Sequence, residues 1–356
     1  MNLIRKTFKC ACLAAGLACA ASAAGTRWTV ERAQAWAAAR PWCCGVNYIP
    51  SNAINYTEMW DKTSFSPELI RRELALMKGL GLNCARVFLQ YLVYEDDPEY
   101  CVRTFRRFLE LCDEAGVKAM PCLFDDCTFG AVVNPRLGKQ DEPLIGWYSW
   151  DWTPSPGRRM VVDPRQHGKL EKYVKGMVGA FKDDERILAW DLYNEPSLGK
   201  HSLALLQKTF AWAREVPLTQ PITTGIWNQS LKEQNEFLLA NCDIITFHCY
   251  QSASETEKFT HRMRASGRPV ICTEWMNRCV KSTVKDCLPV FERTRTGCML
   301  WGLVWGKSQT HLPWGWRPEK GPYKGVWQCN LFRVDHTPYD PAEIALLSEA
   351  VRRANP

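Results

Sequence analysis

The chain has 356 residues, of which 46% are hydrophobic and 23% charged, and its formal net charge is +7 at pH 7. This composition is typical of a globular protein and excludes disordered and fibrous chains. The length fits a single α/β barrel. The positive charge does not indicate a nucleic-acid partner, because the basic cluster "RTFRRF" (103–108) alternates with apolar residues, as on a solvated helix face.

The first 23 residues have the pattern of a signal peptide. Three basic residues, Arg5, Lys6 and Lys9, precede a short apolar run that ends in the small residues "ASA" (21–23). That run is too short to span a bilayer, and no later segment is long enough. We therefore expect a secreted or periplasmic protein with no membrane span, in which residues 24–356 form one domain.

The chain contains 17 cysteines, three of which fall in the signal segment. Many of the others stand inside apolar runs, where a thiol behaves as a small hydrophobic group. No paired spacing typical of a zinc site occurs. We expect mostly free, buried thiols, with one surface bridge such as Cys279–Cys287 as an alternative.

Short apolar runs alternate with helix-like segments along the chain. Eight such strands separated by helices predict a parallel sheet buried on both faces, closed into a (β/α)8 TIM barrel. An open doubly wound sheet is the alternative, but it would normally place a glycine-rich phosphate loop after its first strand, and 47–60 has none. The expected strands are 43–50, 83–90, 117–125, 187–196, 221–227, 243–250, 269–275 and 297–305.

Two helices carry clear end signals, and two connections are unusually long. Ser66 and Pro67 predict the start of one helix, and Asp340 with Glu343 forms the capping-box pattern of the last helix. The long connections, 126–166 and 306–339, follow strands 3 and 8, so both belong to the C-terminal face, where barrel active sites lie. They contain tryptophans whose roles stay open: Trp147, Trp150, Trp152, Trp314, Trp316 and Trp327.

Polar residues mark the C-terminal ends of the predicted strands. A barrel directs all of them toward one mouth, and Glu195 on the fourth strand then faces Glu274 on the seventh. Two carboxylates across a cleft are what glycosidic bond cleavage requires, one protonated as an acid and one ionised. Rigid strand ends can hold them within the tolerance of roughly 0.5 Å that catalysis demands. The full set is Asn47, Arg86, Asp125, Asn194, Glu195, His248, Tyr250, Glu274, Trp301 and Trp305.

The motifs "NEP" (194–196) and "TEW" (273–275), together with "ARVF" (85–88), "FHCY" (247–250) and "LWGLVW" (300–305), resemble clan A glycoside hydrolases, most closely glycoside hydrolase family 5. The resemblance covers essentially the whole chain after the signal segment. It implies a retaining β-glycosidase with Glu195 as acid/base and Glu274 as nucleophile. The substrate-binding residues that it implies are Arg86, Asn194, His248, Tyr250 and Trp301.

The chain departs from the family at strands one and three, where members commonly carry His-Asn-type polar pairs. No role is therefore carried over onto Asp125 or Asp126. The resemblance implies a monomeric hydrolase for β-linked oligo- or polysaccharides, without cofactor or metal. In agreement, no HExxH motif and no GxSxG motif occurs.

Two alternatives to a hydrolase stay open, a non-catalytic carbohydrate-binding barrel and a transglycosylating enzyme on the same scaffold. Intact Glu195 and Glu274 favour catalysis over binding alone. The sugar, the linkage and the choice between endo and exo action also stay open.

Overall fold

A computed structural model describes residues 25–355, so the predicted signal segment 1–23 lies outside the described residues. Within the described chain, nine parallel strands form one sheet in the order β5-β4-β3-β2-β1-β9-β8-β7-β6. They are β1 (Cys44–Asn47), β2 (Cys84–Phe88), β3 (Lys118–Cys122), β4 (Trp190–Asp191), β5 (Ile222–Thr223), β6 (Gly225–Ile226), β7 (Ile245–His248), β8 (Val270–Trp275) and β9 (Gly297–Trp301).

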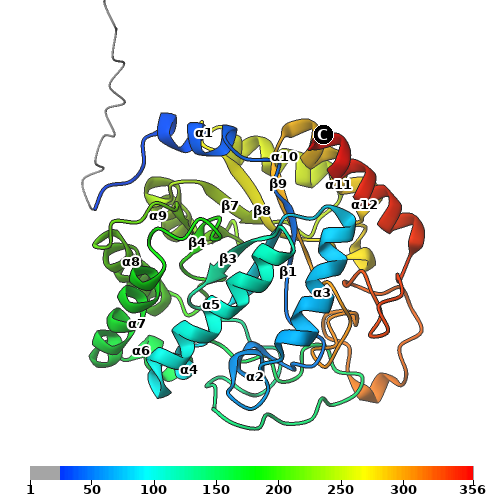
Figure 1. The fold of residues 1–356 in the computed structure, drawn as a ribbon, viewed down its shortest axis with the longest axis horizontal. Coiled ribbons are helices and arrows are strands. Elements are labelled where there is room, and N and C mark those ends of the chain that lie inside the picture. Colours follow the sequence, from blue (N-terminus) through cyan, green and yellow to red (C-terminus); the bar gives the residue numbers. More distant parts are fainter. Residues whose placement is uncertain (1–24, 356) are drawn as a thin grey trace, which may run out of the picture.

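The sheet curves into a barrel, which confirms the (β/α)8 prediction and excludes the open doubly wound sheet (Figure 1). Strand β1 pairs with both β2 and β9, so the first and last strands close the sheet. The two ends of the strand order, β5 and β6, are separated only by Thr224. They are the two halves of the predicted fifth strand, which explains nine strands where eight were expected.

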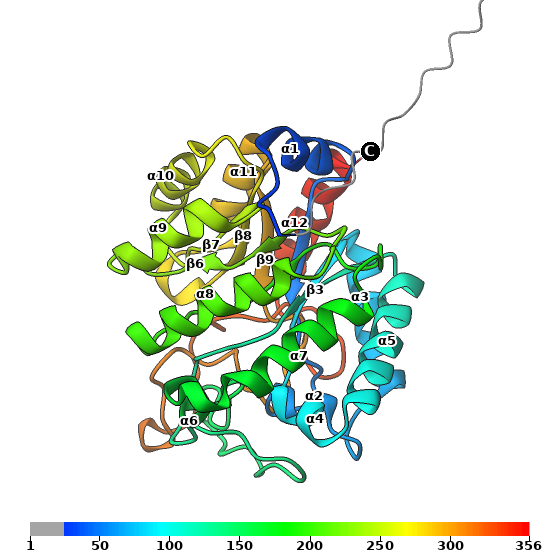
Figure 2. The same ribbon diagram turned by 90° about the vertical axis from the view of Figure 1, so that its left-hand side faces the viewer.

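Helices surround the barrel and cover the outer face of its strands (Figures 1 and 2). The α-helices are α1 (Val30–Ala38), α2 (Tyr56–Trp60), α3 (Pro67–Leu80), α4 (Tyr91–Asp96), α5 (Pro98–Glu114), α6 (Arg158–Val162), α7 (His167–Ala180), α8 (Lys200–Arg214), α9 (Lys232–Asn241), α10 (Ala253–Arg264), α11 (Val284–Thr294) and α12 (Pro341–Ala354). Short 3-10 turns add η1 (Pro164–Gln166), η2 (Arg278–Val280) and η3 (Pro318–Lys320). In the described chain, no helix is both long and apolar enough to cross a membrane.

Both predicted helix starts are correct in position, but only one of the two predicted N-cap side chains makes a capping hydrogen bond. Pro67 begins α3, yet the side chain of Ser66 makes no capping hydrogen bond. Asp340 caps α12 by accepting from the backbone N–H groups of Ala342 and Glu343. Glu343 does not complete the capping box, because its carboxylate pairs with Arg278, and a charged partner is stronger than a backbone N–H.

The barrel interior changes from apolar to polar along its axis. At the N-terminal end of the strands, an apolar cluster that includes Met120, Ile271 and Met299 fills the interior, and Trp36 of α1 packs against it. Nearer the C-terminal ends, the buried Arg86 of β2 contacts Asn47 of β1 and Asp191 of β4. The polar layer forms the floor of the site described below.

All 14 cysteines within residues 25–355 are free. The alternative of a Cys279–Cys287 bridge is therefore wrong. Cys287 is buried on α11, where its thiol lies 3.7 Å from the carbonyl oxygen of Gln251. Cys279 is exposed on η2 and its thiol instead lies 3.7 Å from the hydroxyl of Tyr323. The two side chains thus face different surroundings.

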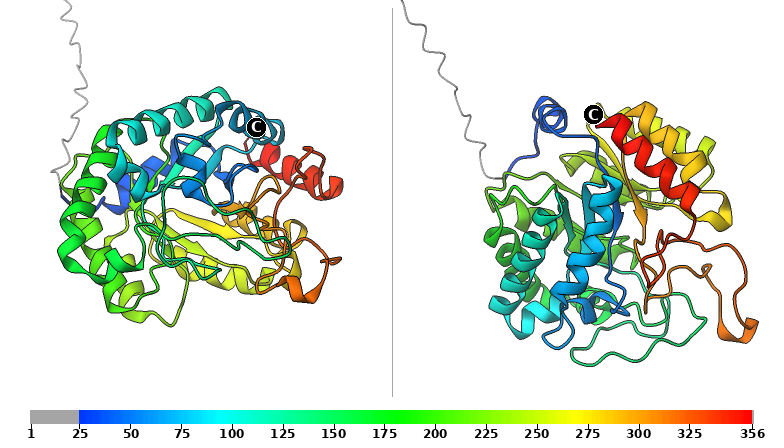
Figure 3. Two further views of the ribbon diagram at one scale, coloured as in Figure 1. Left: turned by 90° about the horizontal axis from the view of Figure 1, so that it is seen from below. Right: turned by 45° about the vertical axis from the view of Figure 1, so that its right-hand side comes forward.

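The two long connections lie together at the C-terminal end of the barrel (Figure 3). The first runs from 123 to 157 before α6 begins, and the second runs from 302 to 340 and contains only η3. The prediction that the connections after strands 3 and 8 are long is thus confirmed, although α6 and η1 shorten the first.

Candidate active site

A cavity of about 380 Å³ opens at the C-terminal end of the barrel, lined by Glu195, His248, Tyr250, Glu274 and Trp301 among others. Its volume lies at the small end of the roughly 300–1,000 Å³ usual for ligand pockets. All seven residues that the sequence predicts for the site meet here, because Arg86 and Asn194 contact the same group of side chains.

Glu274 lies at the end of β8, and its carboxylate is held by two donors. Arg86 Nη1 donates to Oε1 at 2.7 Å, and the hydroxyl of Tyr250 donates to Oε2 at 2.8 Å. The Glu274 side chain is only 5% exposed. Two donors aimed at the two oxygens fix the rotamer and suit an ionised carboxylate.

Arg86 is fully buried and uses all five of its N–H donors. Nε and Nη2 both bind Asp191 Oδ2, at 2.9 and 2.7 Å. Nη1 donates to Asn47 and Glu274, and Nη2 also donates to the Asn194 side chain at 2.7 Å. A guanidinium has five N–H groups in a fixed fork, so this geometry sets the positions of four acceptor side chains at once.

Glu195 follows β4 in a left-handed backbone conformation, with φ of 41°. Such a conformation costs a non-glycine residue about 1–3 kcal/mol and persists where the surroundings over-determine it, often at functional sites. Its Oε1 lies 2.7 Å from Nδ1 of His248, and the thiol of Cys127 donates to Oε2 at 3.3 Å. With a side-chain exposure of 20%, Glu195 is more open to solvent than Glu274.

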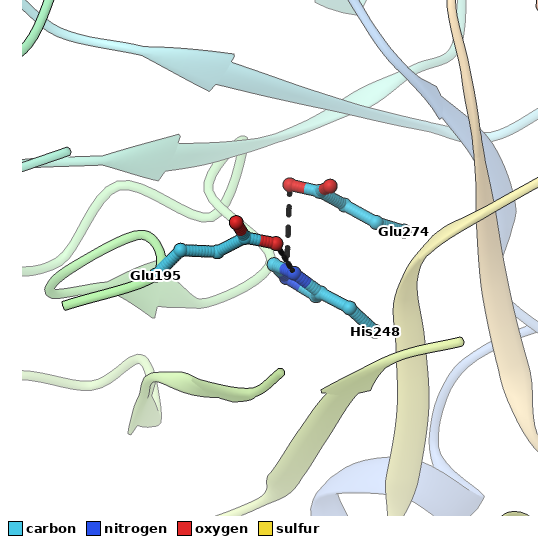
Figure 4. A group of neighbouring side chains, drawn as sticks. All are labelled: Glu195, His248 and Glu274. Carbon is cyan, nitrogen blue, oxygen red and sulfur yellow. Dashed lines mark hydrogen bonds and ion pairs between the residues drawn. The ribbon is translucent and has the colours of Figure 1, made fainter. Parts of the chain in front are cut away.

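One ligand atom from each of Glu195, His248 and Glu274 lies within 4.8 Å of the other two (Figure 4). The nearest oxygens of the two carboxylates thus lie no more than 4.8 Å apart, which suits the short carboxyl separation of a retaining mechanism better than the long separation of an inverting one. The same three groups have the composition of a metal site. The Arg86 cation on Glu274 opposes a second cation at this position.

The charges of the site favour the protonated form of His248 and the ionised form of Glu195. Burial lowers the pKa of His248, but the negative charges of Glu274 and Glu195 and the hydrogen bond to Glu195 outweigh burial and raise it. Burial raises the pKa of Glu195, but the hydrogen bond and positive charge of His248 outweigh that effect and lower it. The expectation from sequence was a site with one protonated carboxyl group. In the ligand-free site, the directions of the two pKa shifts instead favour an ion pair between His248 and Glu195.

Asp125 holds the amide of Asn194 from behind, a contact that sequence reasoning missed. Asn194 Nδ2 donates to Asp125 Oδ1 at 2.8 Å, and Trp152 Nε1 and the hydroxyl of Tyr56 donate to Oδ2 at 2.9 and 3.3 Å. The neighbouring Asp126 binds the backbone N–H of Ser197, so it anchors the loop after β4. The available signal was the pair of carboxylates in "FDDC" directly after an apolar strand.

The buried carboxyl group of Asp125 is expected to make the stability of the protein depend on pH. Burial raises its pKa from 3.8 to about 7, against the effect of its hydrogen-bond donors. Between these two values the folded protein keeps a proton that the unfolded chain has released, so the free energy of unfolding falls as pH rises. We expect the melting temperature of the wild type to fall relative to that of Asp125→Asn between pH 5 and pH 8. The prediction would be contradicted if the melting temperatures of the two proteins differed by the same amount at every pH in that range.

The aromatic residues separate into those that line the cavity and those that pack elsewhere. Trp301 stacks on Phe88, with ring centroids 6.1 Å apart, and meets Trp152 edge-on at 5.5 Å. Trp152 and Trp314 also line the cavity. The other loop tryptophans pack against aromatic neighbours: Trp147 against Trp150, Trp316 against Tyr323, and Trp305 against Trp327.

Comparisons with known proteins extend the description of the fold. No protein-family model matches the sequence, and no curated protein is similar to it. Among solved structures, an exo-β-1,4-mannosidase from Opitutaceae bacterium strain TAV5 is similar over 94% of this chain, with 19% identity and a TM-score of 0.62. The chain spans only 62% of that protein.

Two further solved structures share the fold. A GH5_18 protein from Streptomyces cattleya, solved in complex with GlcNAc, matches 88% of this chain and 80% of its own, with 16% identity and a TM-score of 0.60. An endo-β-1,4-mannanase from Thermotoga petrophila matches 87% and 77%, with 15% identity and a TM-score of 0.55. At the level of the fold, the predicted likeness to glycoside hydrolase family 5 is thus confirmed: the chain shares its fold with a GH5_18 protein, and also with an exo-β-1,4-mannosidase and an endo-β-1,4-mannanase.

Proposed function

We propose that the protein is a retaining β-glycosidase that hydrolyses β-linked glycans by double displacement. The single observation that carries the proposal is the close pairing of Glu195 and Glu274 at the ends of β4 and β8. The two carboxylates have different partners, a cation and a hydroxyl for Glu274 and a histidine and a thiol for Glu195. Different environments are what assign different roles to two carboxyl groups.

In the first step, a Glu274 oxygen attacks the anomeric carbon while the bond from that carbon to the leaving oxygen breaks. Glu195 gives its proton to the leaving oxygen, and a covalent glycosyl-enzyme forms. Glu195 must hold a proton for this step. We infer that the proton comes from Nδ1 of His248, 2.7 Å from Oε1, when the sugar displaces solvent from the ion pair.

In the second step, water replaces the leaving group. Glu195, now ionised, takes a proton from this water, and the water oxygen attacks the anomeric carbon. The bond to Glu274 breaks, and the sugar leaves with the β configuration that it had at the start. Glu195 then returns its proton to His248, so the site is restored and the overall reaction consumes one water molecule.

Asn194 and Trp301 would bind the sugar that is cleaved. Arg86 and Asp125 fix the Asn194 amide from both sides, so the amide can meet the 2-hydroxyl without reorganising. Trp301 offers an aromatic face in the cavity, on which the C–H groups of a pyranose can pack.

Trp301→Ala is expected to raise KM by about tenfold, since the stacking contact is worth roughly 1.4 kcal/mol. The measurement is initial-rate kinetics on an aryl β-glycoside. Trp316→Ala, which removes a tryptophan outside the cavity from a long connection, serves as the matched control and should leave KM unchanged. Unaltered kinetics of Trp301→Ala would remove this residue from the sugar site.

The substrates to test first are β-mannosides, because the solved structures with the same fold include an exo-β-1,4-mannosidase and β-mannanases. The test is sugar release from β-mannan, β-glucan, xylan, β-galactan and aryl β-glycosides by the purified protein. Release by the wild type, but not by Glu274→Gln, supports the proposal. Binding of these glycans without any release would favour a non-catalytic carbohydrate-binding barrel.

A further inference from the structure

The two long connections are joined to each other across the mouth of the barrel (Figure 3). The backbone N–H of Ser149 donates to the carbonyl of Ser308 at 3.0 Å. The side chain of Gln309 accepts from the N–H of Gly146 at 2.9 Å and donates to the carbonyl of Leu144 at 3.0 Å. We call the joined segments 144–155 and 305–314 the outer wall.

The outer wall is also anchored to the connection after β1. The N–H of Lys307 donates to the carbonyl of Ser51 at 3.0 Å, and its ammonium pairs with Glu58 at 3.0 Å. From the same connection, Asn55 donates to the carbonyl of Asp151 at 2.8 Å. Segments that follow three strands, β1, β3 and β9, therefore hold one another in place.

Backbone strain at two residues indicates that the outer wall is rigid. Ser149 and Gln309, which stand at the junction of the two long connections, both have positive φ, 43° and 52°. Both side chains are buried. Each such residue costs about 1–3 kcal/mol and persists only where its surroundings over-determine it. A mobile lid would relax this strain, so we treat the outer wall as a fixed boundary of the cavity.

The outer wall covers the nucleophile's side of the cavity. Its Trp152 meets Trp301 edge-on, and its Trp314 packs against Tyr250, the residue that donates to Glu274, with ring centroids 5.0 Å apart. Tyr148, which also lines the cavity, is buried at 2% exposure. The sugar attacked by Glu274 therefore lies against aromatic side chains, of which Tyr148 and Trp152 are buried and Trp314 is exposed.

The opposite side of the cavity is open. It is lined by Trp227 and Gln229, which follow β6, and by Gln251, which follows β7. Both glutamines are exposed, in contrast to Tyr148 and Trp152 of the outer wall. Strand β6 lies beside His248, since a Cβ on Gly225 would be 2.8 Å from Nε2 of that histidine. Through Nδ1, the same histidine lies 2.7 Å from Glu195 Oε1, so we assign the open side to the leaving group, which receives its proton from Glu195.

We propose that the outer wall ends the cavity after one sugar on the non-reducing side, so that the protein removes single terminal residues from β-linked oligosaccharides. This exo action rests on the proposed glycosidase function. A chain that continued beyond the cleaved sugar would run into Tyr148, Trp152 and Trp314. A leaving group of any length can extend past Gln229 and Gln251 into solvent.

The test uses two kinds of substrate, β-1,4-mannohexaose and cellohexaose reduced at one end, and nitrophenyl β-mannobioside and cellobioside. From the reduced hexaoses we expect a monosaccharide and a reduced pentaose as the first products. From the nitrophenyl disaccharides we expect free monosaccharide first and nitrophenol only after a lag. First products of intermediate length, or direct release of nitrophenol with a disaccharide, would overturn exo action and leave the glycosidase proposal intact.

Two variants test whether the outer wall is what restricts the protein to removing single sugars. Gln309→Gly keeps the positive φ without strain but removes the hydrogen bonds to Gly146 and Leu144. We expect this variant to release some disaccharide directly, while Lys324→Ala, an exposed change in the same connection, keeps the wild-type products. An unchanged product ratio in Gln309→Gly would place the restriction elsewhere. If no substrate releases any sugar, the glycosidase proposal itself fails, and exo action fails with it.

Discussion

Replacing Glu274 by glutamine is expected to lower kcat by roughly 10⁴–10⁶-fold, the loss that follows removal of a key catalytic group in enzymes with covalent intermediates. Glutamine keeps the shape of the side chain and can accept from Arg86, but its amide is not a nucleophile. Arg86 also keeps its two bonds to Asp191, so the buried cation stays paired. We therefore expect the melting temperature to change little. The measurement is steady-state turnover together with thermal unfolding.

Glu343→Gln is the matched control for this experiment. Glu343 is another buried glutamate paired with an arginine, Arg278, but it does not line the cavity. Its replacement should lower the melting temperature, because it weakens a buried pair, and should leave kcat per folded molecule unchanged. If Glu274→Gln behaves in the same way, with lost stability and intact turnover, Glu274 is structural and the proposed nucleophile is wrong.

Glu195→Ala is expected to lose about 10²–10⁴-fold in activity on substrates whose leaving group needs a proton, the range for removal of a general acid. Aryl glycosides with an activated leaving group need no such help, so the glycosyl-enzyme should still form and accumulate. Azide can then enter the space left by the carboxylate and attack the anomeric carbon without a base. We expect azide to restore turnover and to yield a β-glycosyl azide, identified by its NMR coupling constants.

The two glutamate variants should give opposite anomers. In Glu274→Ala, azide would take the place of the nucleophile and attack the substrate directly, which yields an α-glycosyl azide. Glu195→Ala should yield the β anomer, because azide attacks a glycosyl-enzyme that is already inverted once. The same anomer from both variants would contradict the assignment of roles to Glu195 and Glu274. If azide raised the turnover of the wild type by the same factor as that of the variants, the increase would not be a chemical rescue.

Much of this architecture could be predicted from sequence because each strand carries its own signal. Continuous apolar runs mark the strands, and polar residues at their ends mark the mouth of the barrel. Glu195, Glu274 and Arg86 could be found in this way. Strand pairing confirms the topology, and only the division of the fifth strand at Thr224 was not anticipated, because a short break leaves no mark in the apolar pattern.

The residues that sequence reasoning missed act on other side chains and not on a substrate. Asp191 lies inside the predicted strand 187–196 and was given no role there, although a carboxylate in a buried strand requires a buried cation as partner. Asp125 was set aside because the resemblance gave it no role. The joining of the two long connections through Ser149 and Gln309 depends on contacts between residues about 160 positions apart, for which one sequence contains no signal.

Arg86 links the chemistry of the site to the assembly of the barrel. Its guanidinium on β2 meets acceptors from β1, β4 and β8, which are spread over most of the chain. A partly folded chain that lacks any of these strands would bury a cation with acceptors missing, and an unpaired buried charge is among the most costly defects in a protein. A competent site can therefore exist only after all these strands have docked, so recovered activity during refolding reports that β1, β2, β4 and β8 have come together.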